Sequence, residues 1–151
     1  REFRGSALFT WNGSMDLNRK TDLLTMRRGV RLVHLPLADD PATTLECERL
    51  LAKLLFKTSS DNASASADLV RADATGAVYV ESATRRLMAD GVLYDASRRL
   101  VEATASEGNR VTLYDDSRAT VTSAARLRWD LAADRIEVEK PSPVIAPYTP
   151  R

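Results

Sequence analysis

The chain of 151 residues carries 22 basic and 21 acidic side chains, a net charge of +1 and 44% hydrophobic residues, which is typical of one domain with a substantial core. This charge balance argues against an electrostatic nucleic-acid binder, so no nucleic-acid partner is expected. The single cysteine, Cys47, excludes an internal disulfide framework, and no apolar run approaches the roughly 18–20 residues that span a bilayer.

The N-terminal part of the chain alternates apolar and polar residues, which is typical of strands. Ala7 to Met15 predicts a first strand pair, and Leu23 to Met26 a return strand. Arg27 to Gly29 predicts a bend, because glycine reaches backbone conformations closed to other residues, and Val30 to Leu35 then resumes the alternation. The chain begins with Arg rather than Met, so we expect a mature form or a piece of a longer protein.

The middle of the chain contains one ambiguous segment. Pro36 to Pro41 predicts a loop, since its prolines and Asp residues oppose regular pairing. Thr44 to Phe56 fits a helix by its leucines, but its register with the repeats described below favours a strand, which we predict. Cys47 within it is expected to be a small buried side chain. Residues 57–67, mostly Ser, Ala, Asn and Asp, are predicted to be a mobile insertion in a hairpin.

A short phrase occurs twice in the second half of the chain. Leu87 to Ala103 and Val121 to Val138 each hold an alternating segment that ends on an aromatic residue and Asp, then a polar turn, then a second alternating segment. This order predicts two β-hairpins. Asp95 and Asp130 are predicted turn residues, because a carboxylate at that place accepts hydrogen bonds from nearby backbone amides.

Two fainter copies extend the repeat toward the N-terminus. Thr10 to Met26 carries Met15 where the later copies have Tyr94 and Trp129, and Leu45 to Leu50 matches the start of the phrase. The copies recur about every 35 to 42 residues. Such a period indicates a stacked or rolled architecture in which no unit buries its apolar face alone.

These short, amphipathic elements separated by turns predict an all-β antiparallel roll built from degenerate three-strand repeats. Residues 140–151 are proline-rich and are predicted to be an edge piece or exit segment. One alternation face must be enclosed, and a one-residue register error would turn any residue outward. The residues expected on the inner face are Met15, Leu24, Met26, Val30, Leu32, Val78, Val80, Val92, Tyr94, Val101, Val111, Leu113, Leu127, Trp129, Ile136 and Val138.

Met15 to Leu32 resembles the hairpin-plus-strand unit of the OstA-like domain, found in the LptA-type family of lipopolysaccharide-transport proteins. Ala89 to Asp95 and Ala124 to Asp130 resemble the recurring signature of the same family, in which an apolar residue is followed two positions later by an aromatic residue and Asp. The resemblance covers roughly Leu8 to Val138, while the insertion and the proline-rich end depart from the family pattern. It implies one domain over residues 1–151 with a β-jellyroll or taco-like fold. It further implies a location in the periplasm or cell envelope, an apolar interior that holds acyl chains, and open sheet edges that join copies head to tail.

The function that the resemblance implies is a non-enzymatic envelope module that binds or relays lipid. The resemblance implies lipopolysaccharide or another envelope lipid as the partner. An open roll could hold such a lipid because burying each methylene group is worth about 0.8 kcal/mol. The expected lipid-binding residues are the inner-face residues named above without Val101. Arginines at the groove mouth are candidates for pairing with lipid phosphates, the alternative being solvated turn and outward-face residues. These candidates are Arg27, Arg28, Arg98, Arg99, Arg126 and Arg128.

Two other hypotheses compete with lipid binding. In the first, the interior is filled by its own side chains, and the domain is a scaffold that pairs with other OstA-like domains through open sheet edges. In the second, it is an enzyme. The second has little support, because His34 is the only histidine and the acid pairs Asp39-Asp40 and Asp115-Asp116 lie in turn-like contexts. No metal site and no cofactor is predicted.

Overall fold

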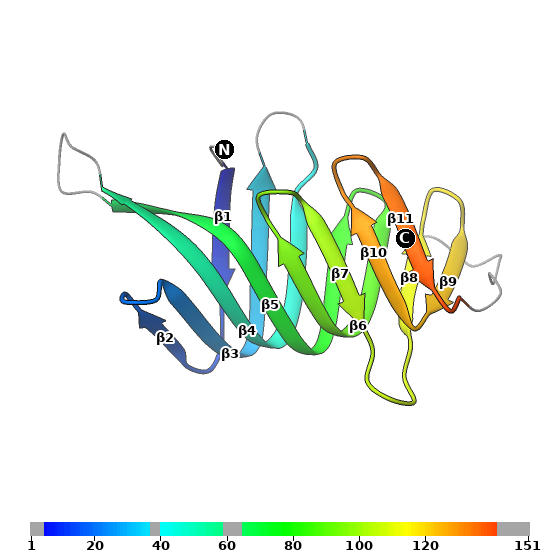
Figure 1. The fold of residues 1–151 in the computed structure, drawn as a ribbon, viewed down its shortest axis with the longest axis horizontal. Helices are drawn as coiled ribbons and strands as arrows, with labels where there is room; N and C mark the ends of the chain where they lie inside the picture. The colour runs from blue at the N-terminus through cyan, green and yellow to red at the C-terminus, as the bar shows by residue number, and fades with distance from the viewer. Residues whose placement is uncertain (1–4, 37–39, 59–64, 142–151) are drawn as a thin grey trace.

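The computed structural model describes residues 5–36, 40–58 and 65–141, and 11 strands in these ranges form one sheet (Figure 1). Every strand pair is antiparallel. The predicted all-β antiparallel class is therefore confirmed. No helix that is long and apolar enough to cross a membrane occurs in the described ranges.

The strands follow one another along the long axis of the molecule, with the N-terminal strands at one end and the C-terminal strands at the other (Figure 1). The main path of pairing is β1-β3-β4-β5-β6-β7-β10-β11, while β2 pairs with β3, β8 with β6, and β9 with β8. The strands are β1 Gly5–Thr10, β2 Met15–Asn18, β3 Leu23–Pro36, β4 Thr43–Thr58, β5 Ala65–Ser82, β6 Arg85–Asp95, β7 Leu100–Thr104, β8 Val111–Asp115, β9 Thr120–Ala124, β10 Arg126–Asp130 and β11 Arg135–Glu139.

The long strands change partners halfway, so the sheet folds over into two layers. The first half of β3 pairs with β2 and its second half with β1; the first half of β6 pairs with β8 and its second half with β7. The strands bury one face, and closing the two layers over each other encloses it, while the outer face keeps some exposed apolar side chains such as Leu55 and Leu93. Layer one comprises the whole of β2, β7, β10 and β11, together with the first halves of β3 and β5 and the second halves of β4 and β6. Layer two comprises β1, the remaining halves, β8 and β9.

The fold line between the layers, here called the crease, crosses the long strands at β-bulges. The register shifts between Arg27 and Val30 in β3 and between Thr75 and Val78 in β5. Gly76, in this second bulge, has a φ of +85°, and a Cβ there would lie 2.9 Å from the Cβ of Glu48 in β4. Glycine therefore lets two strands meet at the crease.

The bend predicted at Arg27 to Gly29 is present, but it lies inside one continuous strand of 14 residues. The same holds for β4 and β5, which have 16 and 18 residues, so the expectation of separate short strands is wrong for this half of the chain. The physical reason is that a bulge bends a strand without breaking its ladder. The strand prediction for Thr44 to Phe56 is confirmed, because β4 spans it.

The predicted pairing of strands within Ala7 to Met15 is wrong. β1 pairs with the second half of β3, from Gly5 opposite Pro36 to Thr10 opposite Arg31, whereas β2 pairs with the first half. The two N-terminal strands thus lie in different layers. They are joined across the crease by residues whose backbone amides, Asn12 N among them, donate to carbonyl groups of the β3 bulge.

The turn residues behave as predicted. Asp95 accepts a hydrogen bond from the backbone N of Arg98, and Asp130 accepts one from the backbone N of Ala133. Each begins a four-residue turn that closes a hairpin. The carboxylates therefore fix the turns from which the following strands start.

In the first hairpin, the equivalent turn begins at Asn18 rather than at Asp16. Asn18 pairs with Leu23, and its Oδ1 accepts a hydrogen bond from the backbone N of Lys20. Leu17, and not Met15, consequently stands where the later copies have their aromatic residue. The sequence alignment was wrong by two residues here.

The predicted insertion at residues 57–67 is partly strand. Lys57 pairs with Ser66 and Thr58 with Ala65, and the resulting two-stranded ribbon projects beyond the rest of the sheet (Figure 1). Residues 59–64 lie outside the described ranges. The predicted exit segment likewise lies outside them, apart from residues 140 and 141.

Candidate functional site

The space between the two layers is lined by the apolar faces of the strands. Twelve of the residues predicted to bind lipid are buried there, as is the inner-face residue Val101, each with at most 8% of its surface exposed. Ile136 is half-buried. The twelve are Leu24, Met26, Val30, Leu32, Val78, Val80, Val92, Tyr94, Val111, Leu113, Leu127 and Trp129.

Met15 and Val138 do not share this burial, which corrects the expectation that both are enclosed. Met15 lies opposite Met26, and Val138 opposite Leu127, so both point toward the inner side. They are 45% and 39% exposed, because β2 and β11 are the last strands of layer one in the part of the chain that the structure describes. Leu17, 38% exposed, accompanies Met15. The apolar inner face therefore reaches the surface at both ends of the roll.

One polar pair crosses the interior between the layers. His34 of β3 in layer two and Tyr94 of β6 in layer one are fully buried, and the His34 Nδ1 lies 2.5 Å from the Tyr94 hydroxyl. Their rings meet edge to face, 5.5 Å apart. The hydrogen bond ties one layer to the other.

Burial shifts both groups of this pair toward their neutral forms. It lowers the pKa of His34 to about 4, with the charge of Arg99 acting in the same direction. Burial likewise raises the pKa of Tyr94 to about 12. Both groups are therefore uncharged at neutral pH, an arrangement suited to packing.

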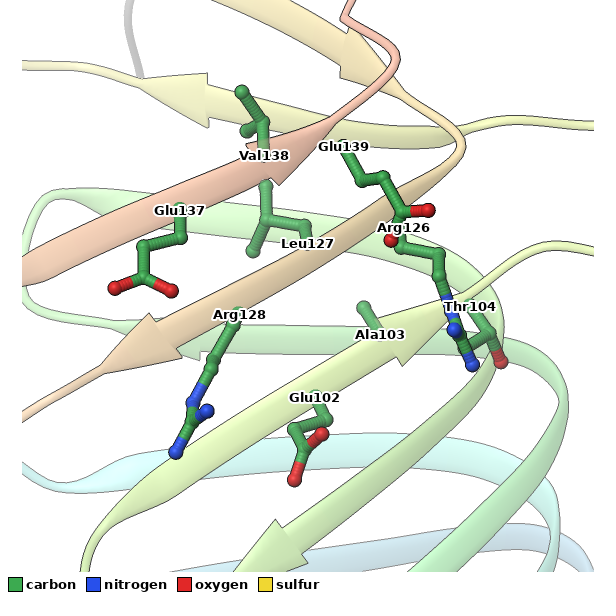
Figure 2. A pocket seen from close by; sticks show the side chains of 9 residues that line it. All are labelled: Glu102, Ala103, Thr104, Arg126, Leu127, Arg128, Glu137, Val138 and Glu139. Atoms are coloured by element: carbon green, nitrogen blue, oxygen red, sulfur yellow. The ribbon is translucent and has the colours of Figure 1, made fainter.

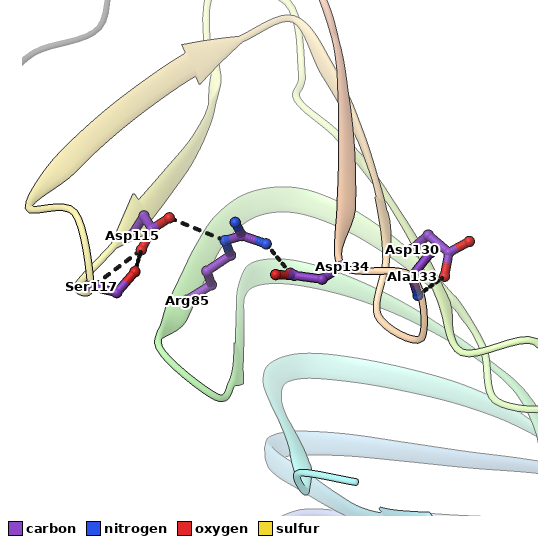
Figure 3. Close-up of polar contacts among 6 residues, drawn as sticks. All are labelled: Arg85, Asp115, Ser117, Asp130, Ala133 and Asp134. Carbon is purple, nitrogen blue, oxygen red and sulfur yellow. Dashed lines mark hydrogen bonds and ion pairs between the residues drawn. The ribbon is translucent and has the colours of Figure 1, made fainter.

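The side of the roll opposite the crease, here called the mouth, is bridged by arginines. Arg85, at the start of β6, lies 3.4 Å from Asp115 of β8 and also pairs with Asp134 of the β10–β11 turn (Figure 3). Arg99, in the β6–β7 turn, lies 2.9 Å from Asp40. Asp134 and Arg99 belong to layer one, whereas Arg85 and Asp40 belong to layer two. Both bridges therefore connect the layers.

A cavity of about 220 Å³ lies at the mouth between these bridges. Layer two contributes the turn from Ser82 to Arg85, and layer one contributes Arg99, Trp129 and Leu131. The indole Nε1 of Trp129 and the Nε of Arg99 are buried donors with no acceptor in the described part of the chain. The mouth cavity thus combines an apolar floor with cationic, donor-rich walls.

The carboxylates of the acid pair Asp115-Asp116 each pair with an arginine of β6. Hydrogen bonds from Ser117 and the charge of Arg85 outweigh burial and hold the pKa of Asp115 below its usual value, while Asp116 pairs with Arg86 at 2.8 Å. Asp39 lies outside the described residues. Among the residues that are described, no group of acidic, His and Cys side chains is placed to hold a metal ion.

Cys47 is buried, as predicted, and its thiol donates to the carbonyl oxygen of Arg49. Burial raises the pKa of this thiol to about 12. It is therefore a protonated core side chain at neutral pH, without the thiolate that nucleophilic chemistry requires.

Only one of the arginines predicted at the groove mouth is found there. Arg99 lines the mouth cavity, whereas the neighbouring Arg98 is exposed and pairs with Asp95 at 2.8 Å. Arg27 and Arg28 are exposed at the crease.

Arg126 and Arg128 lie on the outer face of layer one, which is the alternative place that the sequence left open for them. Figure 2 shows them beside a surface hollow of about 370 Å³ over β7, β10 and β11. Arg128 stands opposite Glu102 and Glu137 in the register, and Arg126 opposite Glu139. Such cross-strand charges stabilise neighbouring strands. The hollow is thus an outer surface on which arginines and glutamates alternate, away from the interior.

No protein-family model matches the sequence, and no curated protein matches it significantly. Among solved structures, the chain is similar to LptH from Pseudomonas aeruginosa, whose crystal structure is described as the LptA-homologous periplasmic component of the conserved lipopolysaccharide transport device. The TM-score is 0.66 with 12% identity, over 97% of this chain and 91% of that chain. The chain has an LptA-like fold. The resemblance inferred from the sequence is confirmed at the level of the fold.

Two residues of the LptA-like roll, Leu17 and Arg85, were not predicted from the sequence. Leu17 was missed because the turn of the first hairpin was predicted to begin at Asp16 instead of Asn18. The signal was present, since Asn18 and Leu23 enclose a four-residue turn of the same length as the turns after Asp95 and Asp130. Arg85 carried no local signal. It reaches the mouth because β6 starts directly after a tight turn and lies opposite the end of β8.

Proposed function

We propose that this domain binds an envelope lipid of the lipopolysaccharide type between its two layers and passes it along the roll, in the periplasm or cell envelope, without catalysing a reaction. The observation that carries the proposal is the apolar inner face, which is buried in the middle and exposed at both terminal strands. A relay needs this arrangement, because lipid must enter at one end and leave at the other. The likeness in fold to the periplasmic transport component LptH supports it.

Binding would be driven by the apolar surface that acyl chains remove from water. At about 0.8 kcal/mol for each methylene group, one chain of about ten methylenes gains roughly 8 kcal/mol before ordering costs. The middle of the interior is close-packed, since Met26, Val30 and Leu32 are each at most 1% exposed. Lipid must therefore separate the layers as it enters, and the exposed ends offer the first contacts.

The test is photocrosslinking with a photoreactive phenylalanine derivative placed at Leu17, at Val138 or at Leu93. Leu93 is the matched control, because it is 37% exposed against 38% for Leu17 but lies on the outer face. We expect purified protein mixed with labelled lipopolysaccharide to capture it from Leu17 and Val138 and not from Leu93. Equal capture at all three positions, or none, would refute lipid binding by the inner face.

The second candidate is a scaffold that pairs with further copies through its sheet edges. It is favoured by the close-packed interior and by β1, β2, β9 and β11, which end the layers. In the same experiment this reading predicts crosslinks from Leu17 and Val138 to a second copy of the chain, with no labelled lipid attached. Gel electrophoresis separates the two products by mass.

A further inference from the structure

The mouth cavity pairs buried cations with exposed anions. The side chains of Arg85 and Arg99 are only 14% and 12% exposed, whereas those of Asp134 and Asp40 are 70% and 54% exposed. A buried guanidinium needs a counter-ion, because leaving it unpaired costs several kcal/mol. A carboxylate that is mostly in water loses little when it leaves the pair. The arginines are thus fixed parts of the cavity, and the two aspartates are exchangeable.

The cavity also holds hydrogen-bond donors beyond those that the two aspartates use. The Nε1 of Trp129 and the Nε of Arg99 are buried and have no acceptor in the described ranges, although buried donors in proteins are nearly always paired. A ligand that brings several acceptor oxygens would satisfy them. The chemistry of the walls therefore favours an oxyanion with more than two oxygens.

The floor of the cavity connects this polar site to the interior. Trp129 lies opposite Val101 in layer one and is 2% exposed, and Leu131 packs against the core beside it. A molecule with an anionic head at the arginines would point its apolar part past Trp129 into the space between the layers. The mouth cavity thus offers a polar wall to the head and an apolar floor to the tail of an amphiphilic molecule.

We propose that the mouth cavity binds a phosphate-type oxyanion, with Arg85 and Arg99 as its cations and with Asp134 and Asp40 as placeholders that the oxyanion displaces. This inference rests on the proposed function, since the head group of the bound lipid is the expected source. A phosphate group suits the site because it carries up to two negative charges and three acceptor oxygens, enough to engage both arginines and the Trp129 Nε1. Because Arg85 belongs to layer two and Arg99 to layer one, the bound oxyanion would connect the layers in place of the two displaced bridges.

The experiment uses the Trp11→Phe background, in which Trp129 is the only tryptophan and its fluorescence reports on the cavity. Three probes are titrated at constant ionic strength: inorganic phosphate, dihexanoyl phosphatidic acid and uncharged dihexanoylglycerol. We expect Arg85→Gln and Arg99→Gln each to weaken phosphatidic acid binding at least about 10-fold, in line with the loss of a charge-assisted hydrogen bond. Dihexanoylglycerol binding should change less than about 2-fold.

The aspartate variants give the opposite sign and guard against a folding artefact. Asp40→Asn and Asp134→Asn remove the competing anions, so each should strengthen binding of phosphatidic acid and inorganic phosphate about 3- to 10-fold. Arg128→Gln is the matched control, because this exposed arginine lies on the outer face, and it should leave all affinities unchanged. Tighter binding after loss of an aspartate does not arise from a destabilised fold.

The outcomes separate the oxyanion site from lipid binding. Arginine-dependent binding of phosphate without any lipid supports the site and assigns it to free phosphate, at the expense of the proposed function. Arginine-independent binding of both lipids leaves the proposed function standing and overturns the site. Asparagine variants that bind no more tightly than the parent also overturn it, because the aspartates would then not occupy the place of the oxyanion.

Discussion

Acidification below neutral pH should destabilise the roll through His34 before the carboxylates take up protons. Its pKa is lowered from 6.5 to about 4 in the folded chain, first by burial and then by the charge of Arg99. In the unfolded chain His34 takes up a proton near pH 6.5, whereas in the folded chain it does so only near pH 4. The stability contributed by neutral His34 is therefore complete above pH 6.5 and is lost as the pH falls through this window. We expect a loss of about 2 kcal/mol by pH 5 and about 3 kcal/mol at lower pH.

Urea unfolding between pH 7.5 and 4.5 measures this effect, with His34→Gln as the non-titrating reference. His34 is the only histidine, so the difference between the two slopes isolates it. In Arg99→Gln, the imidazole resonances should titrate at higher pH than in the parent, whereas Arg98→Gln should leave them unchanged, because Arg98 is exposed and faces away. Equal pH slopes in the parent and His34→Gln, or an imidazole pKa near 6.5 in the folded protein, would refute the reasoning.

Three further substitutions test the packing. Gly76→Ala should lower the free energy of unfolding by about 2 to 3 kcal/mol, because the new side chain would have a positive φ and would clash at the crease. Gly108 has a similar φ but lies in open space, so Gly108→Ala should lower the free energy of unfolding by only about 1 kcal/mol. Chemical denaturation measures both values. Trp129→Ala should lower the free energy of unfolding by about 3 to 5 kcal/mol, because it leaves a cavity at a buried site. Trp11 is exposed, so Trp11→Ala should lower it by less than about 1 kcal/mol. Equal losses in the two variants would contradict the burial of Trp129. Asp130→Ala should lose about 1 kcal/mol by removing the turn acceptor, and an unchanged melting temperature would argue against that role.

The strand content follows largely from the sequence because it depends on local alternation. The hairpins around Asp95 and Asp130 are specified by an aromatic residue, an Asp and a four-residue turn, all close in the chain. Val92 and Leu127 are buried as their positions in the alternation predict. In the first hairpin the same local rule was applied to Asp16 instead of Asn18, and the predicted register was therefore wrong by two residues.

The pairing of distant strands was beyond local signals. A glycine such as Gly76 has the same preference for positive φ in a turn that ends a strand and in a bulge that bends one. Only the pairing of β5 with β4 and β6 on both sides of Gly76 decides that a bulge occurs. β1 likewise pairs with the second half of β3 because that edge is left open when β2 covers the first half.

The candidate site divides in the same way. The sequence by itself determined which side chains are apolar and face one side, because strand geometry alternates them. Only the tertiary structure decided what becomes of the adjacent Arg98 and Arg99, which are alike in the sequence. Arg98 points into solvent beside Asp95, while Arg99, with a φ of +52°, turns under layer two toward Asp40. The mouth cavity exists only because the crease brings turns from both layers together, and no spacing along the chain encodes that meeting.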